Sequence, residues 1–135
     1  MALFEWNDSY SVKVGLFDGH HKKLVGMINE LHQAMVSRQA NAVIEKILDS
    51  LVDYTKYHFT EEERLMKQHG YPGYEQQKKE HADLVSQVAD IQDRYKKGSL
   101  SVSLETMSFL KNWLSSHILG TDKKYSRFFA DRGVV

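Results

Sequence analysis

The sequence contains no cysteine among its 135 residues. Disulfide bonds, iron–sulfur clusters, thiolate zinc sites and covalently attached c-type haem are therefore excluded, because each of them requires cysteine sulfur. Any metal that this chain binds is therefore not held by thiolate sulfur.

The sequence also lacks an excess of charge of either sign and any long apolar run. Lysine and arginine together number 18, as do aspartate and glutamate, so no basic field attracts nucleic acid or an acidic membrane. No apolar stretch has the length of a membrane span, and the first eight residues do not resemble a signal peptide. We therefore expect a cytoplasmic protein with no nucleic-acid or membrane partner.

Proline occurs only once, as Pro72, in the turn sequence Gly70-Tyr71-Pro72-Gly73. Elsewhere apolar residues recur at helical intervals, which predicts amphipathic helices over 19–37, 42–68, 74–96 and 102–119. Asp18 is expected to cap the first of them. With short connections, the pattern predicts an all-α, up-down-up-down four-helix bundle. We expect a single domain over 1–135, with an ordered N-terminal arm over 1–17, the bundle over 18–130 and a short C-terminal helix from Asp122.

Each predicted helix carries one histidine on its apolar stripe: His21, His58, His81 and His117. Buried imidazoles need partners, and the only acidic residues expected beside them are Glu62 and Asp122. Imidazole and carboxylate together suit iron, manganese or zinc. Because a carboxylate can bridge two cations, this set favours a dinuclear centre over a mononuclear one.

The spacing within the set is uneven. His58 and Glu62 are four residues apart and share one helix face. His117 and Asp122 are five apart, which is out of register for a straight α-helix. We therefore expect the chain to bend near Gly120 to bring Asp122 in.

The sequence resembles bacterial hemerythrin, a non-haem di-iron oxygen-binding four-helix bundle, in the order of these six residues: His21, His58-x-x-x-Glu62, His81 and His117-x-x-x-x-Asp122. The resemblance runs from Trp6 to about Phe128. Its motifs are Asp18-x-x-His21-Lys22-x-Leu24, His58-Phe59-x-x-Glu61-Glu62, Gly70-Tyr71-Pro72 and Trp113-Leu114-x-x-His117-Ile118.

This resemblance implies reversible dioxygen binding, for storage, delivery or sensing, and a binding protein in preference to an enzyme. It implies two iron ions, one held by His21 and His58 and the other by His81 and His117. Glu62 and Asp122 would bridge them together with an oxo or hydroxo group. Dioxygen would bind at the iron held by His21 and His58, in an apolar pocket lined by Leu24, Phe59, Trp113, Leu114 and Ile118.

The sequence departs from the family pattern at Gln77, where the resemblance predicts a further histidine four residues before His81. The Gln77 amide oxygen could ligate the metal, water could take its place, or that iron could keep fewer ligands. His20 is a poor substitute, because it lies about 100° from His21 around the helix. We hypothesise that the iron nearest Gln77 is the more weakly held.

Two other functions fit the same residues. One is a di-iron oxidase or peroxidase that uses an open position at Gln77. The other is a bundle that has lost its metal and serves as a signalling module. Neither a redox partner nor a signalling partner is identified by the sequence.

Overall fold

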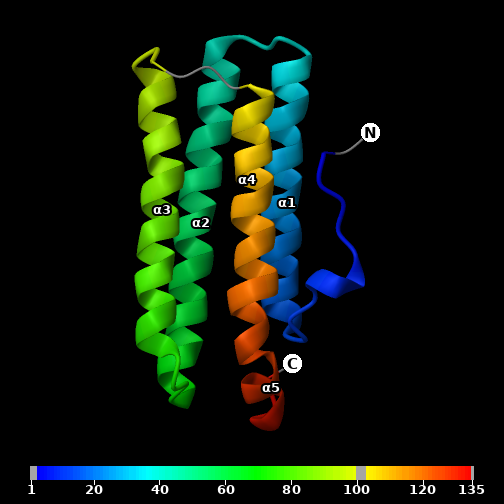
Figure 1. The fold of residues 1–135 in the computed structure, drawn as a ribbon, viewed down its shortest axis with the longest axis vertical. Helices are drawn as coiled ribbons and strands as arrows, with labels where there is room; N and C mark the ends of the chain where they lie inside the picture. The colour runs from blue at the N-terminus through cyan, green and yellow to red at the C-terminus, as the bar shows by residue number, and fades with distance from the viewer. Residues whose placement is uncertain (1–2, 100–102, 135) are drawn as a thin grey trace.

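The computed structural model describes residues 3–99 and 103–134. Four long helices run alternately up and down along its length (Figure 1): α1 (Gly15–Val36), α2 (Asn41–His69), α3 (Tyr74–Lys96) and α4 (Leu104–Ser116). A 3-10 turn, η1 (Asp8–Tyr10), precedes them, and a π-helix, η2 (His117–Asp122), leads into the short α5 (Lys123–Asp131). The predicted all-α four-helix bundle with a short C-terminal helix is confirmed. The fourth helix was predicted from residue 102, which lies outside the described residues.

The first helix starts earlier than its sequence pattern predicts. It begins at Gly15 after an extended Val14, so Asp18 lies within the first turn and is not the N-cap. The Asp18 carboxylate instead accepts hydrogen bonds from the Val12 backbone N–H at 2.8 Å and the Ser11 hydroxyl at 2.6 Å. The capping prediction was wrong because this carboxylate binds the preceding arm.

The described part of the N-terminal arm begins at Leu3 and lies beside α1 (Figure 1). Asn29 of α1 binds Phe4 twice, accepting from its N–H at 2.9 Å and donating to its carbonyl at 2.8 Å. At the other end of the arm, the Ser126 hydroxyl of α5 donates to the Val12 carbonyl at 2.6 Å. The arm therefore joins the first and last helices of the fold.

The core is a continuous apolar column along the bundle axis. Burying each large aliphatic side chain stabilises the fold by about 1.5–3 kcal/mol. No helix within the described ranges is long and apolar enough to cross a bilayer. α3 contributes Val88, η2 contributes Ile118 and the N-terminal arm contributes Val12, all fully buried. The other fully buried large aliphatic and thioether side chains come from α1, α2 and α4: Leu24, Ile28, Leu31, Leu48, Leu51, Met66, Met107 and Leu110.

The turn between α2 and α3 depends on a left-handed residue. Gly70 has φ +71°, and its N–H donates to the Lys67 carbonyl while the Tyr71 N–H donates to the Met66 carbonyl. These two bonds form a Schellman motif, which satisfies carbonyls at the helix end. This turn sets the register of α3 against α2, and hence of His81 against His58.

Replacing Gly70 by alanine should destabilise the protein, because a Cβ in the left-handed region costs about 1–2 kcal/mol. Gly26→Ala is the matched control: Gly26 is exposed inside α1, with open space around a Cβ, and the change should stabilise the protein by roughly 0.5–1 kcal/mol. Urea denaturation of both variants measures the difference. Equal effects of the two substitutions would contradict the role given to Gly70.

Candidate metal centre

The six residues predicted to bind metal lie together in the middle of the bundle. His21 comes from α1, His58 and Glu62 from α2, and His81 from α3, while η2 supplies His117 and Asp122. All six are at most 3% exposed. Four separate segments of the chain thus direct imidazoles and carboxylates to one buried point.

The donor atoms form two groups that share both carboxylates. One group is His21, His58, Glu62 and Asp122, and the other is Glu62, His81, His117 and Asp122. Within each group the donor atoms lie within 4.8 Å of one another. This arrangement fits two cations bridged by two carboxylates.

The distances show how each carboxylate faces both groups. Glu62 Oε1 lies 3.1 Å from His58 Nε2 and 3.4 Å from His81 Nε2. Asp122 Oδ2 lies 3.1 Å from His21 Nε2, and its Oδ1 lies 2.9 Å from His117 Nε2. The two acidic side chains therefore occupy the space between the two pairs of imidazoles.

Short as these distances are, the inward-facing atoms do not form hydrogen bonds with one another. The buried side-chain nitrogen and oxygen atoms without a hydrogen-bond partner, within the described part of the chain, all belong to this cluster or to Gln77. They include Nε2 of all four histidines, Glu62 Oε1 and both Asp122 oxygens. Unpaired buried polar atoms are costly, and cations placed between these donors would pair them.

The five-residue spacing of His117 and Asp122 is accommodated by a change of helix type. Both lie in η2, whose wider π-helical turn repeats at about five residues and so puts them on the same side. A bend at Gly120 was predicted instead. Gly120 has no positive φ, and a Cβ there would meet nothing within 4 Å, so the geometry does not require glycine at this position.

Comparison with known proteins agrees with this geometry. A family model described as the hemerythrin HHE cation binding domain matches residues 12–129. The chain belongs to the hemerythrin family. It is 37% identical over 126 residues to a bacteriohemerythrin of Stenotrophomonas maltophilia, covering 93% of this chain and 81% of that protein. It is 36% identical over 126 residues to a bacteriohemerythrin of Methylococcus capsulatus, covering 93% of this chain and 95% of that protein.

The likeness extends to solved structures. A crystal structure of wild-type hemerythrin matches this fold with a TM-score of 0.87 and 35% identity, covering 93% of this chain and 97% of that chain. The resemblance seen in the sequence motifs is therefore confirmed. The two groups of histidine and carboxylate side chains lie within the cation-binding domain of this hemerythrin-family chain.

A second layer of side chains supports three of the four imidazoles in this hemerythrin fold. Glu63 Oε2 lies 2.8 Å from His81 Nδ1, and Glu80 Oε1 lies 3.0 Å from His117 Nδ1. His20 Nδ1 lies 2.8 Å from His58 Nδ1. Such contacts orient a ligating histidine and set which nitrogen carries the proton. His21 Nδ1 has no such partner among the described residues.

Sequence reasoning missed this layer. Glu63 and Glu80 adjoin predicted ligands, which was the available signal, but a carboxylate beside a ligand more often faces solvent. His20 does not belong to either of the two groups, but it contacts His58 across the α1–α2 interface. Tyr125 was also missed: its buried hydroxyl donates to Glu62 Oε2.

The cluster shifts the pKa values of its members in opposite directions. Burial disfavours charge on Glu62, but the neighbouring His58 holds the pKa of Glu62 well below its usual value. Burial likewise opposes charge on His117, yet the Asp122 carboxylate raises the pKa of His117 to about 10. Burial and the charge of Glu62 raise the pKa of Tyr125 well above 10.0, so its hydroxyl stays protonated and can donate.

Gln77 lies one turn before His81 and is 3% exposed. Its amide nitrogen donates to the Thr121 carbonyl of η2 at 3.2 Å. Its amide oxygen is buried without a hydrogen-bond partner. Gln77 therefore contacts the same π-helix that carries His117 and Asp122.

The five side chains expected to line an oxygen pocket are all buried: Leu24, Phe59, Trp113, Leu114 and Ile118. The Phe59 ring stacks on His81 at 4.0 Å and meets the edge of His117 at 5.4 Å. Phe59 therefore lies nearest the histidines of the second group, and less close to His58, at 5.6 Å. Trp113 is fixed by a 3.2 Å hydrogen bond from its indole N–H to the Leu84 carbonyl.

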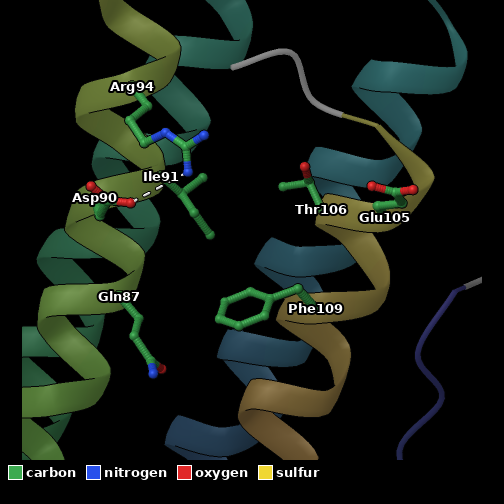
Figure 2. Close-up of a pocket in the computed structure, with 7 residues that line it drawn as sticks. All are labelled: Gln87, Asp90, Ile91, Arg94, Glu105, Thr106 and Phe109. Carbon is green, nitrogen blue, oxygen red and sulfur yellow. Dashed lines mark ion pairs between the residues drawn. The ribbon is translucent and has the colours of Figure 1, made fainter. Parts of the chain in front are cut away.

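A surface groove of about 380 Å³ lies apart from the metal centre, between α3 and α4 (Figure 2). An ion pair of 3.6 Å between Asp90 and Arg94 runs along its α3 side, and Phe109 projects from α4. A second hollow of about 310 Å³ shares Gln87 and Phe109 with it and extends to His117. The groove itself has no histidine in its lining, so its chemistry differs from that of the buried cluster.

The contact between Glu80 and His117 should stabilise the metal-free protein in a limited pH window. Burial opposes charge on His117, but Asp122 first and Glu80 after it raise the pKa of His117 from 6.5 to about 10. The stabilisation from this charge, of which Glu80 supplies a part, is therefore complete below pH 6.5 and is lost as the pH rises through 10. The pKa of Glu80 is lowered from 4.5 to about 2, chiefly by its hydrogen bond with His117. Its contribution is complete above pH 4.5 and is lost as the pH falls through 2.

Glu80→Gln should therefore destabilise metal-free protein most between pH 4.5 and 6.5. Urea denaturation across a pH series measures this, with Asp83→Asn, an exposed position on α3, as the control. A destabilisation that does not change with pH would contradict the ionic nature of the contact.

Proposed function

We propose that this chain binds dioxygen reversibly at a non-haem di-iron centre. The observation that supports this most strongly is the pair of donor groups that share Glu62 and Asp122 inside a hemerythrin-family domain. Related proteins of similar length carry the names bacteriohemerythrin and myohemerythrin.

The donor chemistry fits iron. In this proposal His21 and His58 hold one ion, His81 and His117 hold the other, and Glu62 and Asp122 bridge them, with an oxo or hydroxo group as a further bridge. Imidazole nitrogen and carboxylate oxygen are donors that suit iron. Two iron ions held by these residues would supply the two electrons needed to bind dioxygen and would take them back on its release.

The remaining residues of the site keep the centre in place and dry. Glu63, Glu80 and His20 each hold a ligand imidazole in one orientation through its Nδ1 atom. The Tyr125 hydroxyl donates to Glu62 and so limits the rotation of this carboxylate. In this proposal the buried apolar side chains around the centre, Leu24, Phe59, Trp113, Leu114 and Ile118, would exclude water and anions that compete with dioxygen.

A metal-free signalling bundle is a less suitable assignment for this chain. Without cations, the inward-facing nitrogen and oxygen atoms of all six ligands remain unpaired in the core. A bundle that did not bind metal would be more stable with apolar residues at these positions. The donor atoms therefore favour a metal-binding role.

The di-iron centre can be tested by measuring iron content and visible absorption together. The chain loaded with ferrous iron should hold two irons and develop a charge-transfer band when oxygen is admitted, and the band should fade when oxygen is withdrawn. His58→Ala should lose the band and at least one iron. His32→Gln, at a half-buried position of α1 outside both groups, should retain both.

Other results would contradict the proposal. An absence of iron uptake would favour the signalling alternative. Continuous consumption of oxygen or peroxide in the presence of a reductant, above free-iron controls, would favour an oxidase or peroxidase.

The apolar pocket makes a separate prediction. Leu24→Asn keeps the size of the side chain but adds a polar group beside the proposed oxygen site, which should admit water. We expect the oxygenated protein to decay roughly tenfold faster, the scale typical of changes around a metal site. Leu16→Asn is the control, because Leu16 is 50% exposed on the same helix. The decay rate of the visible band measures both, and equal lifetimes would exclude this role for Leu24.

A further inference from the structure

We propose that the Gln77 amide oxygen is a seventh protein ligand of the centre, bound to the metal held by His81 and His117. This inference rests on the proposed function in one respect: a metal must bind within the group of Glu62, His81, His117 and Asp122.

The position of Gln77 on α3 supports this role. It precedes His81 by four residues, so both side chains lie on the same helix face, one turn apart. Gln77 is 3% exposed and His81 is 2% exposed. A glutamine is rarely buried to this degree unless both ends of its amide have partners.

Only one end of the Gln77 amide has a partner in the protein. The Nε2 atom donates to the Thr121 carbonyl at 3.2 Å, which fixes the plane of the amide. The Oε1 atom is left buried without a hydrogen bond. Within the described residues, the other side-chain atoms in this condition all belong to the six proposed ligands. All of these atoms except His21 Nδ1 face the carboxylates or imidazoles of the centre, and a metal ion there would pair Gln77 Oε1 as it would pair them.

Thr121 connects Gln77 to the ligands of η2. Its carbonyl accepts from Gln77, and its hydroxyl donates to Glu80 Oε1 at 2.6 Å. The same Glu80 oxygen lies 3.0 Å from His117 Nδ1. One residue therefore orients both the amide of Gln77 and the carboxylate that holds His117.

The outer carboxylates offset the exchange of an imidazole for an amide. A neutral amide oxygen is a weaker donor to iron than an imidazole nitrogen. Glu63 and Glu80 lie behind His81 and His117, and carboxylates in this position raise the basicity of a ligating imidazole. In the other group, His58 is supported by an imidazole, His20. The second metal is therefore expected to stay bound in the natural chain, in contrast to the weak binding hypothesised from the sequence.

Metal content and coordination are tested with cobalt(II) as the probe. Its visible spectrum reports the coordination number and does not depend on any activity. The chain and each variant are loaded with two equivalents and then exposed to a chelator. The natural chain should release both ions slowly. In Gln77→Leu, one of the two should be released at least about tenfold faster, with a spectrum of lower coordination number.

Two further variants separate ligation from a purely structural contact. Gln77→His should keep two slowly released ions and change the spectrum, since nitrogen replaces oxygen. Gln77→Glu retains an oxygen donor but loses the N–H that binds Thr121, and it should also keep two ions. Gln76→Leu, an exposed neighbour on the same helix, should match the natural chain in both measurements.

The results that overturn the proposal are distinct from those that overturn the di-iron function. If the natural chain and Gln77→Leu release cobalt at the same rate with the same spectrum, Gln77 does not ligate, even if the variant melts at a lower temperature. If Gln77→Glu loses an ion as readily as Gln77→Leu, the contact with Thr121 is what matters and ligation is excluded. If the natural chain itself takes up no metal, the proposed function fails together with this inference.

Discussion

Two carboxylates buried in the middle of the bundle constrain the rest of the fold. Glu62 and Asp122 are fully buried, and their oxygens lie close to Nε2 atoms from α1, α2, α3 and η2. Two negative charges in a medium of low dielectric constant are tolerated only beside compensating positive charge. In the metal-free chain part of this charge comes from His81 and His117: burial opposes their protonation, but the neighbouring carboxylates raise the pKa of both imidazoles. Cations provide it better, because they also pair the inward-facing lone pairs.

This requirement explains features of the chain far from the centre. The helix ends are built to fix the register, as in the Schellman turn at Gly70 between α2 and α3. The arm joins α1 to α5 through Asn29 and Ser126, and α5 brings Tyr125 onto Glu62. The π-helix spans His117 to Asp122. π-Helical turns are frequent at functional sites, and here the turn places two ligands on one side.

The layer around the ligands is not symmetric. Carboxylates support His81 and His117, while an imidazole supports His58. The side of the centre with carboxylate support is the side where Gln77 stands in place of a histidine. Gln77 therefore replaces the expected histidine on the side where Glu63 and Glu80 strengthen His81 and His117 as donors. The two halves of the centre therefore differ both in their ligands and in what supports them.

The sequence by itself determined the bundle and the convergence of the four histidines and Glu62, because the helical period decides which side chains share a buried face. It named Asp122 as the second carboxylate, although the α-helical period does not bring Asp122 in line with His117. It placed His58 and Glu62 on one face and marked Gln77 as the position that departs from the family pattern. Only the tertiary structure decided the contacts between elements, such as Glu80 with His117, Tyr125 with Glu62 and His20 with His58, since no sequence spacing relates residues on different helices. It also decided that a π-helical turn, and not a bend at Gly120, brings Asp122 to the centre. Either a π-helical turn or a bend can put two residues five apart on the same side of the chain. Which of the two forms depends on packing against the neighbouring helices.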